Sequence, residues 1–138
     1  VLAVLMAAYG VAPTVNVIFL PFLVVLALLT ALGVALWLSA LNVLYRDVQY
    51  IIPFLIQLWM FISPVMYPMS KIETYPTWVQ AIYNLNPMTG VIAGFRWALF
   101  GEQAPGQLFW VSVAAVAVIL VGGLYYFRRM ERVFADIV

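Results

Sequence analysis

Long uncharged runs separated by short polar breaks dominate the sequence. No charged residue occurs in residues 1–45, and as a single helix this run would measure about 68 Å, roughly twice the hydrocarbon thickness of a bilayer. Turn-forming residues at Tyr9-Gly10 and in the Pro-Thr-Val-Asn segment interrupt it. The run therefore predicts the end of one membrane helix, a turn over residues 9–16 and a full crossing over residues 17–41.

Two further apolar runs are long enough to cross a membrane. A polar loop at residues 45–50 precedes the first, which predicts a crossing over residues 51–68. Prolines within this run indicate a helix that bends or ends near Ser63-Pro64. The last crossing is expected over residues 108–127. The pattern predicts an all-α, polytopic membrane protein with about three full crossings and the end of a fourth.

The segment NPMTGVIAGFRWALFG, residues 86–101, is apolar but too short to cross. Asn86 followed by Pro87 predicts a helix start, and Gly101 can end that helix after about 21 Å. With a shorter helix before it, the segment predicts a re-entrant helical hairpin over residues 75–101. Non-helical backbone at the turn of such a hairpin is tolerated at membrane depth only inside protein or beside a water-filled cavity.

The second helix of this hairpin has two different faces. One narrow face carries small residues: Gly90, Gly94, Ala98 and Gly101. That face lets another helix approach closely, whereas Arg96 points to the other side. Two interpretations of Arg96 stay open. It snorkels to the outer interface or pairs with a nearby carbonyl or carboxylate, or it faces a conduit and meets anionic or hydroxyl-rich cargo, because guanidinium pairs well with phosphate.

The arginines set the expected orientation, because cytoplasmic segments of membrane proteins are enriched in positive charge. Arg128, Arg129 and Arg132 directly follow the last crossing and are expected in a cytoplasmic tail over residues 128–138. Arg46 is the next marker of the inner side. All of these arginines lie on one side only if the hairpin dips into the membrane and returns on the outer face.

Composition supports a membrane protein and restricts its chemistry. The chain is 67% hydrophobic and 8% charged, with a mean hydropathy of +1.11, whereas soluble domains carry about a quarter charged residues. Cysteine and histidine are absent, which excludes disulfides and removes the commonest metal ligands. No basic stripe suggests a nucleic-acid partner. We therefore expect neither a metal site nor nucleic-acid binding.

The sequence offers little to catalysis. All acidic residues lie outside the expected crossings: Asp47, Glu73, Glu102, Glu131 and Asp136. A proton-coupled carrier normally needs an ionisable group inside the membrane. No glycine-rich phosphate loop with a following lysine is present, so this chain is not expected to hydrolyse ATP. We expect no catalytic residue, no cofactor in this chain and, if energy is needed, a partner that supplies it.

Two groups of side chains have alternative interpretations. Arg46 and Asp47 either cap the ends of two helices or contact a cytoplasmic partner. Many aromatic side chains gather around the expected outer half: Trp59, Phe61, Tyr67, Tyr75, Trp78, Tyr83, Phe95 and Trp97. These aromatics either form an interfacial belt or line a conduit, where their flat faces would suit sugar rings.

The order of these features resembles the second half of an ABC-2 type permease, and most closely the exporters of polysaccharide and polyol phosphate, which move O-antigen, capsule or teichoic acid. The resemblance covers nearly the whole chain from about residue 40 onward. It is carried by these residues, in this order: Arg46-Asp47, Ser63-Pro64-Val65 with Tyr67, Asn86-Pro87, Arg96, Gly101, Glu131 and Phe134-Ala135-Asp136.

The resemblance implies a homodimeric channel in the bacterial cytoplasmic (inner) membrane, with six crossings per subunit and gate helices at its outer mouth. It also implies a lipid-linked glycan cargo and a separate ATP-binding cassette subunit, which would bind ATP and magnesium. The implied conduit or gate residues are Arg96, Asn86, Pro87, Tyr83, Trp97, Trp59 and Tyr67. The implied ATPase-facing residues are Arg46, Asp47, Arg128 and Arg129.

Other functions are compatible with the same sequence. An ABC-2 permease for drugs or other small molecules is the nearest alternative. A non-transporting membrane scaffold and a glycosyltransferase acting on lipid carriers are the others. The chain starts without methionine and without a basic stretch before its first apolar run, and we interpret it as the C-terminal half of a longer protein.

Overall fold

The computed structural model describes residues 1–10, 14–65, 67, 71 and 74–134. These residues form α-helices and one short 3-10 helix, without a β-strand among them, which confirms the all-α class. The elements are α1 (Leu2–Ala8), η1 (Val15–Phe19), α2 (Leu20–Leu44), α3 (Val48–Ile62), α4 (Thr77–Leu85), α5 (Pro87–Phe100) and α6 (Gly106–Phe134).

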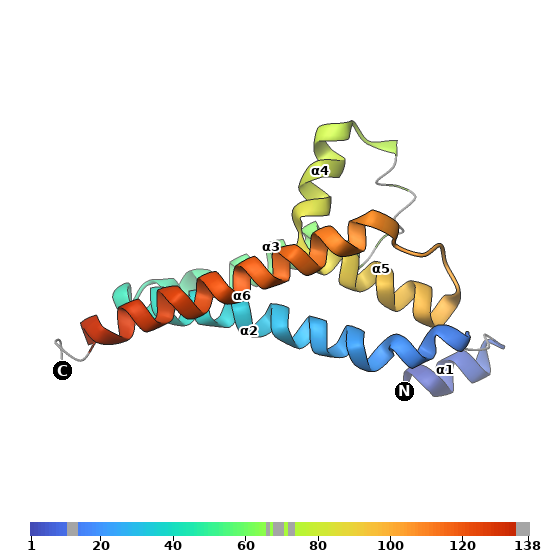
Figure 1. Ribbon diagram of the computed structural model, residues 1–138, viewed down its shortest axis with the longest axis horizontal. Coiled ribbons are helices and arrows are strands. Elements are labelled where there is room, and N and C mark those ends of the chain that lie inside the picture. Colours follow the sequence, from blue (N-terminus) through green and yellow to red (C-terminus); the bar gives the residue numbers. More distant parts are fainter. Residues whose placement is uncertain (11–13, 66, 68–70, 72–73, 135–138) are drawn as a thin grey trace.

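The two longest helices, α2 and α6, lie side by side and run in the same direction (Figure 1). Phe22 contacts Phe109 near the start of both helices, and Trp37 contacts Tyr126 near their ends. The helix α3 returns along α2, and α4 and α5 gather at the end where α2 and α6 begin. The fold is therefore a parallel pair of long helices with a helical hairpin at one end.

Within the described residues, two helices are long and apolar enough to cross a membrane: Val15–Leu44 and Phe109–Glu131. The apolar helix Val48–Ile62 is shorter. It ends where the sequence predicts, because Ser63 has extended backbone (φ −81°, ψ 137°) and Pro64 follows. The number of crossings and the dipping of the hairpin into the membrane stay predictions.

The closest approach between α2 and α6 is a glycine seam that the sequence analysis did not single out. A Cβ atom on Gly123 would lie 2.9 Å from the carbonyl oxygen of Gly33. Beside this contact, the Trp37 indole N–H donates to the carbonyl of Ile119 at 3.1 Å. The same indole stacks on Tyr126 with ring centroids 5.0 Å apart. Backbone-to-backbone contact thus fixes the register of the two long helices.

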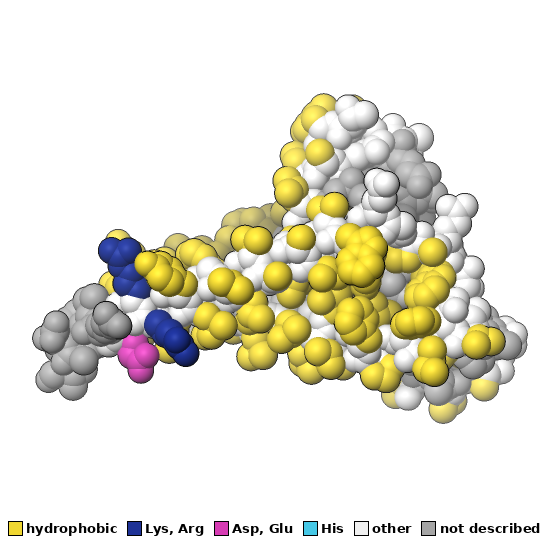
Figure 2. Space-filling view, in the orientation of Figure 1, with side chains coloured by type: hydrophobic (Ala, Val, Ile, Leu, Met, Phe, Trp, Pro, Cys, Tyr) yellow, Lys and Arg dark blue, Asp and Glu magenta, His cyan; other side chains and the backbone are white. Residues whose placement is uncertain are grey.

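Large apolar side chains cover the outside of the long helices (Figure 2). Trp110 and Val118 on α6, for example, are 70% and 71% exposed. The lysine and arginine side chains visible in this view gather at the far end of α6, away from the hairpin. Such a surface suits hydrocarbon along the helices and water at the charged end.

Candidate functional site

The start of α5 is built as the sequence predicts. The side-chain oxygen Oδ1 of Asn86 accepts a hydrogen bond from the backbone N–H of Met88 at 3.1 Å. Pro87 occupies the first turn, where its missing N–H leaves no donor unpaired. At the other end, Gly101 adopts a left-handed conformation (φ 69°) and closes the helix. The predicted cap, first residue and terminator of this helix are confirmed.

The small face of α5 packs against α2 and α6. Gly90, Gly94 and Ala98 are all buried, and a Cβ atom on Gly94 would lie 2.7 Å from the side chain of Leu23. The backbone N–H of Gly90 donates to the hydroxyl of Ser112 in α6 at 3.0 Å. The predicted close approach at this face is confirmed, although Gly101 is exposed and serves only to end the helix.

Two buried hydroxyls at this face should respond differently to removal. Ser112→Ala is expected to lower the unfolding temperature, because it leaves the Gly90 N–H without its partner at a buried site. Thr89→Val should leave that temperature unchanged or raise it, since the Thr89 hydroxyl is buried and has no hydrogen-bond partner among the described residues. Thermal unfolding of the full-length protein in mild detergent checks both. Equal losses would contradict this assignment.

Arg96 leaves the opposite side of α5 and reaches the turn that follows α3. Its guanidinium donates to the carbonyl of Pro64 at 3.0 Å, of Tyr67 at 3.2 Å and of Val65 at 3.3 Å. The side chain is partly buried. Of the two interpretations of Arg96, the geometry favours pairing with nearby carbonyls, because its donors already point at backbone oxygens.

Asn86 and Tyr67 strengthen the same junction. The Asn86 amide Nδ2 donates to the hydroxyl of Ser63 at 3.0 Å, and Ser63 is only 3% exposed. The Tyr67 hydroxyl donates to the carbonyl of Phe61 at 3.2 Å, in the last turn of α3. These contacts satisfy carbonyls that a helix end leaves without intrahelical partners. We call Ser63, Tyr67, Asn86 and Arg96 the clasp.

Tyr83 on α4 completes the surroundings of the clasp. Its ring meets the ring of Tyr67 edge-on, with centroids 6.1 Å apart. Burial raises the pKa of the Tyr67 phenol above its ordinary value, and the neighbouring Tyr83 raises it further. The phenol therefore stays protonated across the physiological pH range and remains a hydrogen-bond donor. Because arginine also keeps its charge in that range, the clasp should not depend on pH near neutrality.

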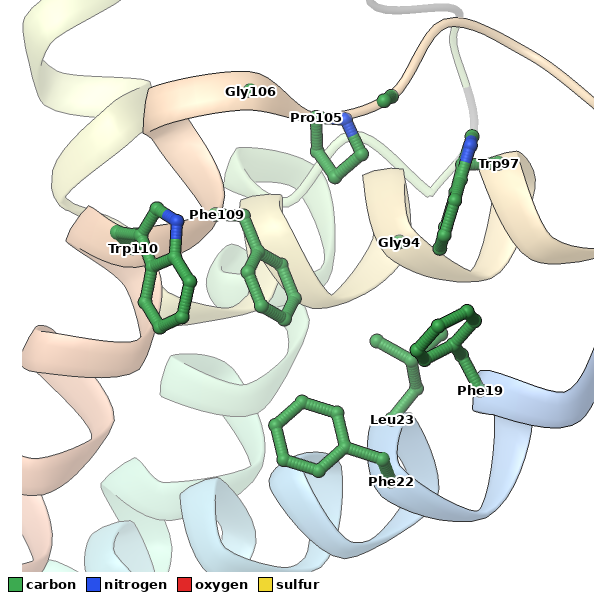
Figure 3. A pocket seen from close by; sticks show the side chains of 10 residues that line it. Phe19, Phe22, Leu23, Gly94, Trp97, Pro105, Gly106, Phe109 and Trp110 are labelled. Atoms are coloured by element: carbon green, nitrogen blue, oxygen red, sulfur yellow. The ribbon is translucent and has the colours of Figure 1, made fainter. Parts of the chain in front are cut away.

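An apolar pocket lies elsewhere on α5, between its small face and the first turns of α2 and α6 (Figure 3). Its volume is about 550 Å³. The Trp97 ring stands at one side with its centroid 5.4 Å from that of Phe19. The lining residues are Phe19, Phe22, Leu23, Gly94, Trp97, Ala104, Pro105, Gly106, Phe109 and Trp110. The pocket offers hydrocarbon surface and aromatic faces.

The structure thus divides the expected conduit residues into groups. It brings Arg96, Asn86 and Tyr67 together in the clasp, with Tyr83 beside them. The others lie apart from these contacts, with Trp97 in the apolar pocket, Pro87 buried in the first turn of α5 and Trp59 partly exposed one turn before the end of α3.

The expected ATPase-facing residues lie at the other end of the molecule. Arg46 and Asp47 are exposed in the turn between α2 and α3, and the Asp47 side chain makes no capping hydrogen bond. Arg128 and Arg129 are exposed on α6, which continues as a helix to Phe134. The side chain of Arg132 and all of residues 135–138, like Glu73, lie outside the described part of the chain.

Comparison with known proteins gives three matches over nearly the whole chain and one family. The family model described as "ABC-2 type transporter" matches residues 1–100. The chain is 33% identical over 131 residues to "O-antigen export system permease protein RfbA" of Myxococcus xanthus, covering 93% of this chain and 50% of that protein. Two Klebsiella pneumoniae proteins of the same description are 22% identical over 138 residues and 21% identical over 130 residues.

The Klebsiella pneumoniae matches cover 99% and 94% of this chain, and 52% and 49% of those proteins. The chain therefore spans about half the length of the curated relatives it matches. No solved structure is a significant match.

Proposed function

This chain belongs to the ABC-2 type transporter family, and from that membership we propose that it forms the C-terminal half of a permease that exports lipid-linked polysaccharide or polyol phosphate. The observation that carries the proposal is the 33% identity to an O-antigen export permease over 93% of the chain. That alignment is long enough to include most of the clasp, the hairpin and the long helices. A permease for drugs or other small molecules remains the nearest alternative.

The proposed topology follows from the directions of the helices. Because α2 and α6 run in the same direction, the chain between them must return once, and α3 provides that return. The helix α3 has 15 residues, about 22 Å of rise, so its flanking turns must complete the crossing. The hairpin α4–α5 then lies on the outer face of the bacterial cytoplasmic (inner) membrane. Arg46, Arg128 and Arg129 then lie in the cytoplasm, in agreement with the positive-inside bias.

Energy in this proposal comes from a separate ATP-binding cassette subunit, which carries the ATP and magnesium. The sequence supports this division of labour because it has no phosphate-binding loop with a following lysine. The exposed turn at Arg46 and Asp47 and the exposed residues Arg128 and Arg129 form the proposed contact with that subunit. Two copies of the complete permease would surround the conduit.

The hairpin is the proposed gate of the outer mouth. Tyr83 and Trp59 are partly exposed aromatic side chains near the clasp and could offer flat faces to sugar rings in the conduit. Trp97 would instead contact the apolar part of a cargo or of a lipid, because its surroundings in the pocket are apolar. Asn86 and Pro87 serve the gate by fixing the start of α5.

Purification of the full-length protein from mild detergent tests this function. We expect an ATP-hydrolysing subunit to co-purify in stoichiometric amount. Arg46→Glu should reduce the amount that co-purifies, because it reverses an exposed charge at the proposed contact. The matched control is Lys71→Glu, an exposed charge outside the proposed contact, which should leave the amount unchanged. A well-folded protein that repeatedly purifies alone would favour the scaffold or glycosyltransferase alternatives.

A further inference from the structure

The helix α3 is held to the rest of the chain mainly at its ends. Its own residues include none that is buried, and apolar side chains along it are open, such as Phe54 at 61% and Ile56 at 60% exposure. The turn after it is different, because Ser63 is 3% exposed and Pro64 is fully buried. The outer end of α3 is therefore fixed, while its length is free on most sides in this chain.

Polar contacts of the clasp join this outer end to the hairpin. One guanidinium donates to three carbonyls of a single turn. Hydrogen bonds to an ionised donor are stronger than neutral ones, and the planar guanidinium holds several partners in fixed directions. In a membrane these carbonyls have no water to replace Arg96, so separating the two parts would leave them unpaired.

The other side of α5 is suited to sliding. Its contacts with α2 and α6 run along Gly90, Gly94 and Ala98, which present almost no side chain to interlock. The atom nearest to Gly94 is the flexible end of Leu23, which borders the apolar pocket. The hairpin is thus joined directionally to α3 and smoothly to the two long helices.

From this asymmetry we infer that Arg96 is a positioning residue that makes the end of α3 and the hairpin α4–α5 move as one unit. The inference rests on the proposed function, in which the opposite end of α3 begins at the cytoplasmic turn with Arg46 and Asp47. A displacement of that turn by the ATPase would travel along α3 and reach the outer hairpin through the clasp. The permease would then couple its two ends through one helix and one arginine.

A cysteine reporter on the hairpin tests this coupling, since the chain has no cysteine of its own. Leu85, at the end of α4, is 69% exposed and is replaced by cysteine in the full-length permease with its ATPase. The measurement is the rate of reaction of this thiol with a membrane-impermeant maleimide, with and without ATP and vanadate. We expect the ratio of the two rates to differ severalfold from one when Arg96 is present.

Arg96→Ala should bring this ratio close to one while ATP hydrolysis continues, and Arg96→Lys should retain part of it. A second reporter, Trp110→Cys at the start of α6, is 70% exposed and makes none of the clasp's hydrogen bonds. Its rate without ATP should be the same with Arg96 and with Arg96→Ala, which shows that the variant is folded. If Arg96→Ala does not assemble, Tyr67→Phe removes the bond to Phe61 and should lower the ratio in part.

The outcomes separate this inference from the proposed function. A full ratio in Arg96→Ala, or in Tyr67→Phe where that variant has to replace it, overturns the positioning role. A full ratio with lost export would instead assign Arg96 to contact with cargo. If the parent complex hydrolyses ATP but the Leu85→Cys thiol does not respond, the inference fails and the function stands. If no ATPase co-purifies, the proposed function fails first.

Discussion

Gly123→Val is expected to prevent the accumulation of folded protein. A Cβ atom at this position would lie 2.9 Å from the carbonyl oxygen of Gly33 and 3.1 Å from the ring of Trp37. The carbonyl belongs to the helix backbone and cannot rotate away, so α2 and α6 would have to move apart. Overpacking of a tight contact costs about 1–3 kcal/mol, occasionally more, and a β-branched side chain adds two further methyl groups. Size-exclusion chromatography of the full-length protein in detergent measures the loss.

Two control variants make this prediction specific to the seam. Val121→Leu changes the volume of a side chain that is 65% exposed on the same helix and should leave the elution peak unchanged. Gly94→Ala should have a small effect, because the atom it meets is the movable end of Leu23 beside the pocket. A normal peak for Gly123→Val would mean that the two long helices do not pack through this glycine.

The ends of the helices could be predicted from the sequence, because local chemistry decides them. Asn86 and Pro87 start α5, and Gly101 ends it in the left-handed conformation that glycine adopts without strain. Ser63-Pro64 ends α3, since the residue before a proline avoids helical backbone. The length of α6 was less predictable. Its helix continues into the charged segment after Phe127, where arginine and glutamate are good helix formers in water.

The partners of these helices could not be predicted, because they depend on contacts far apart in the sequence. The Thr14 hydroxyl donates to the carbonyl of Ala98 at 2.6 Å, and Ser112 accepts from Gly90. A single hydroxyl in an apolar run gives no sign of which helix it will meet. The glycine seam was hidden for the same reason, since small residues are common throughout these runs. For Arg96 the pattern showed the side of the helix but left the contacting group open.

Asn86→Ala is expected to give the second large loss, seen as a lower unfolding temperature of the full-length protein in detergent. One side chain performs two tasks here, because its oxygen caps Met88 and its amide donates to Ser63. Loss of an asparagine cap costs about 1 kcal/mol. A side-chain hydrogen bond between helices in a membrane is worth about 0.6 kcal/mol on average. Removing both should therefore exceed the effect of removing either alone.

A double-mutant cycle with Ser63→Ala separates the two tasks. If the amide of Asn86 bonds to Ser63 as the structure shows, the loss from Asn86→Ala should be smaller when Ser63 is already alanine. Asn86→Ser should retain the cap, because serine is a good capping residue, and should lose the contact with Ser63. Its unfolding temperature is expected between those of the parent and Asn86→Ala. Gln57→Ala, an exposed change on α3, is the matched control and should have no effect. Additive losses in the cycle would show that the end of α3 is held without this bond, and Arg96 would then have to fix it with Tyr67 alone.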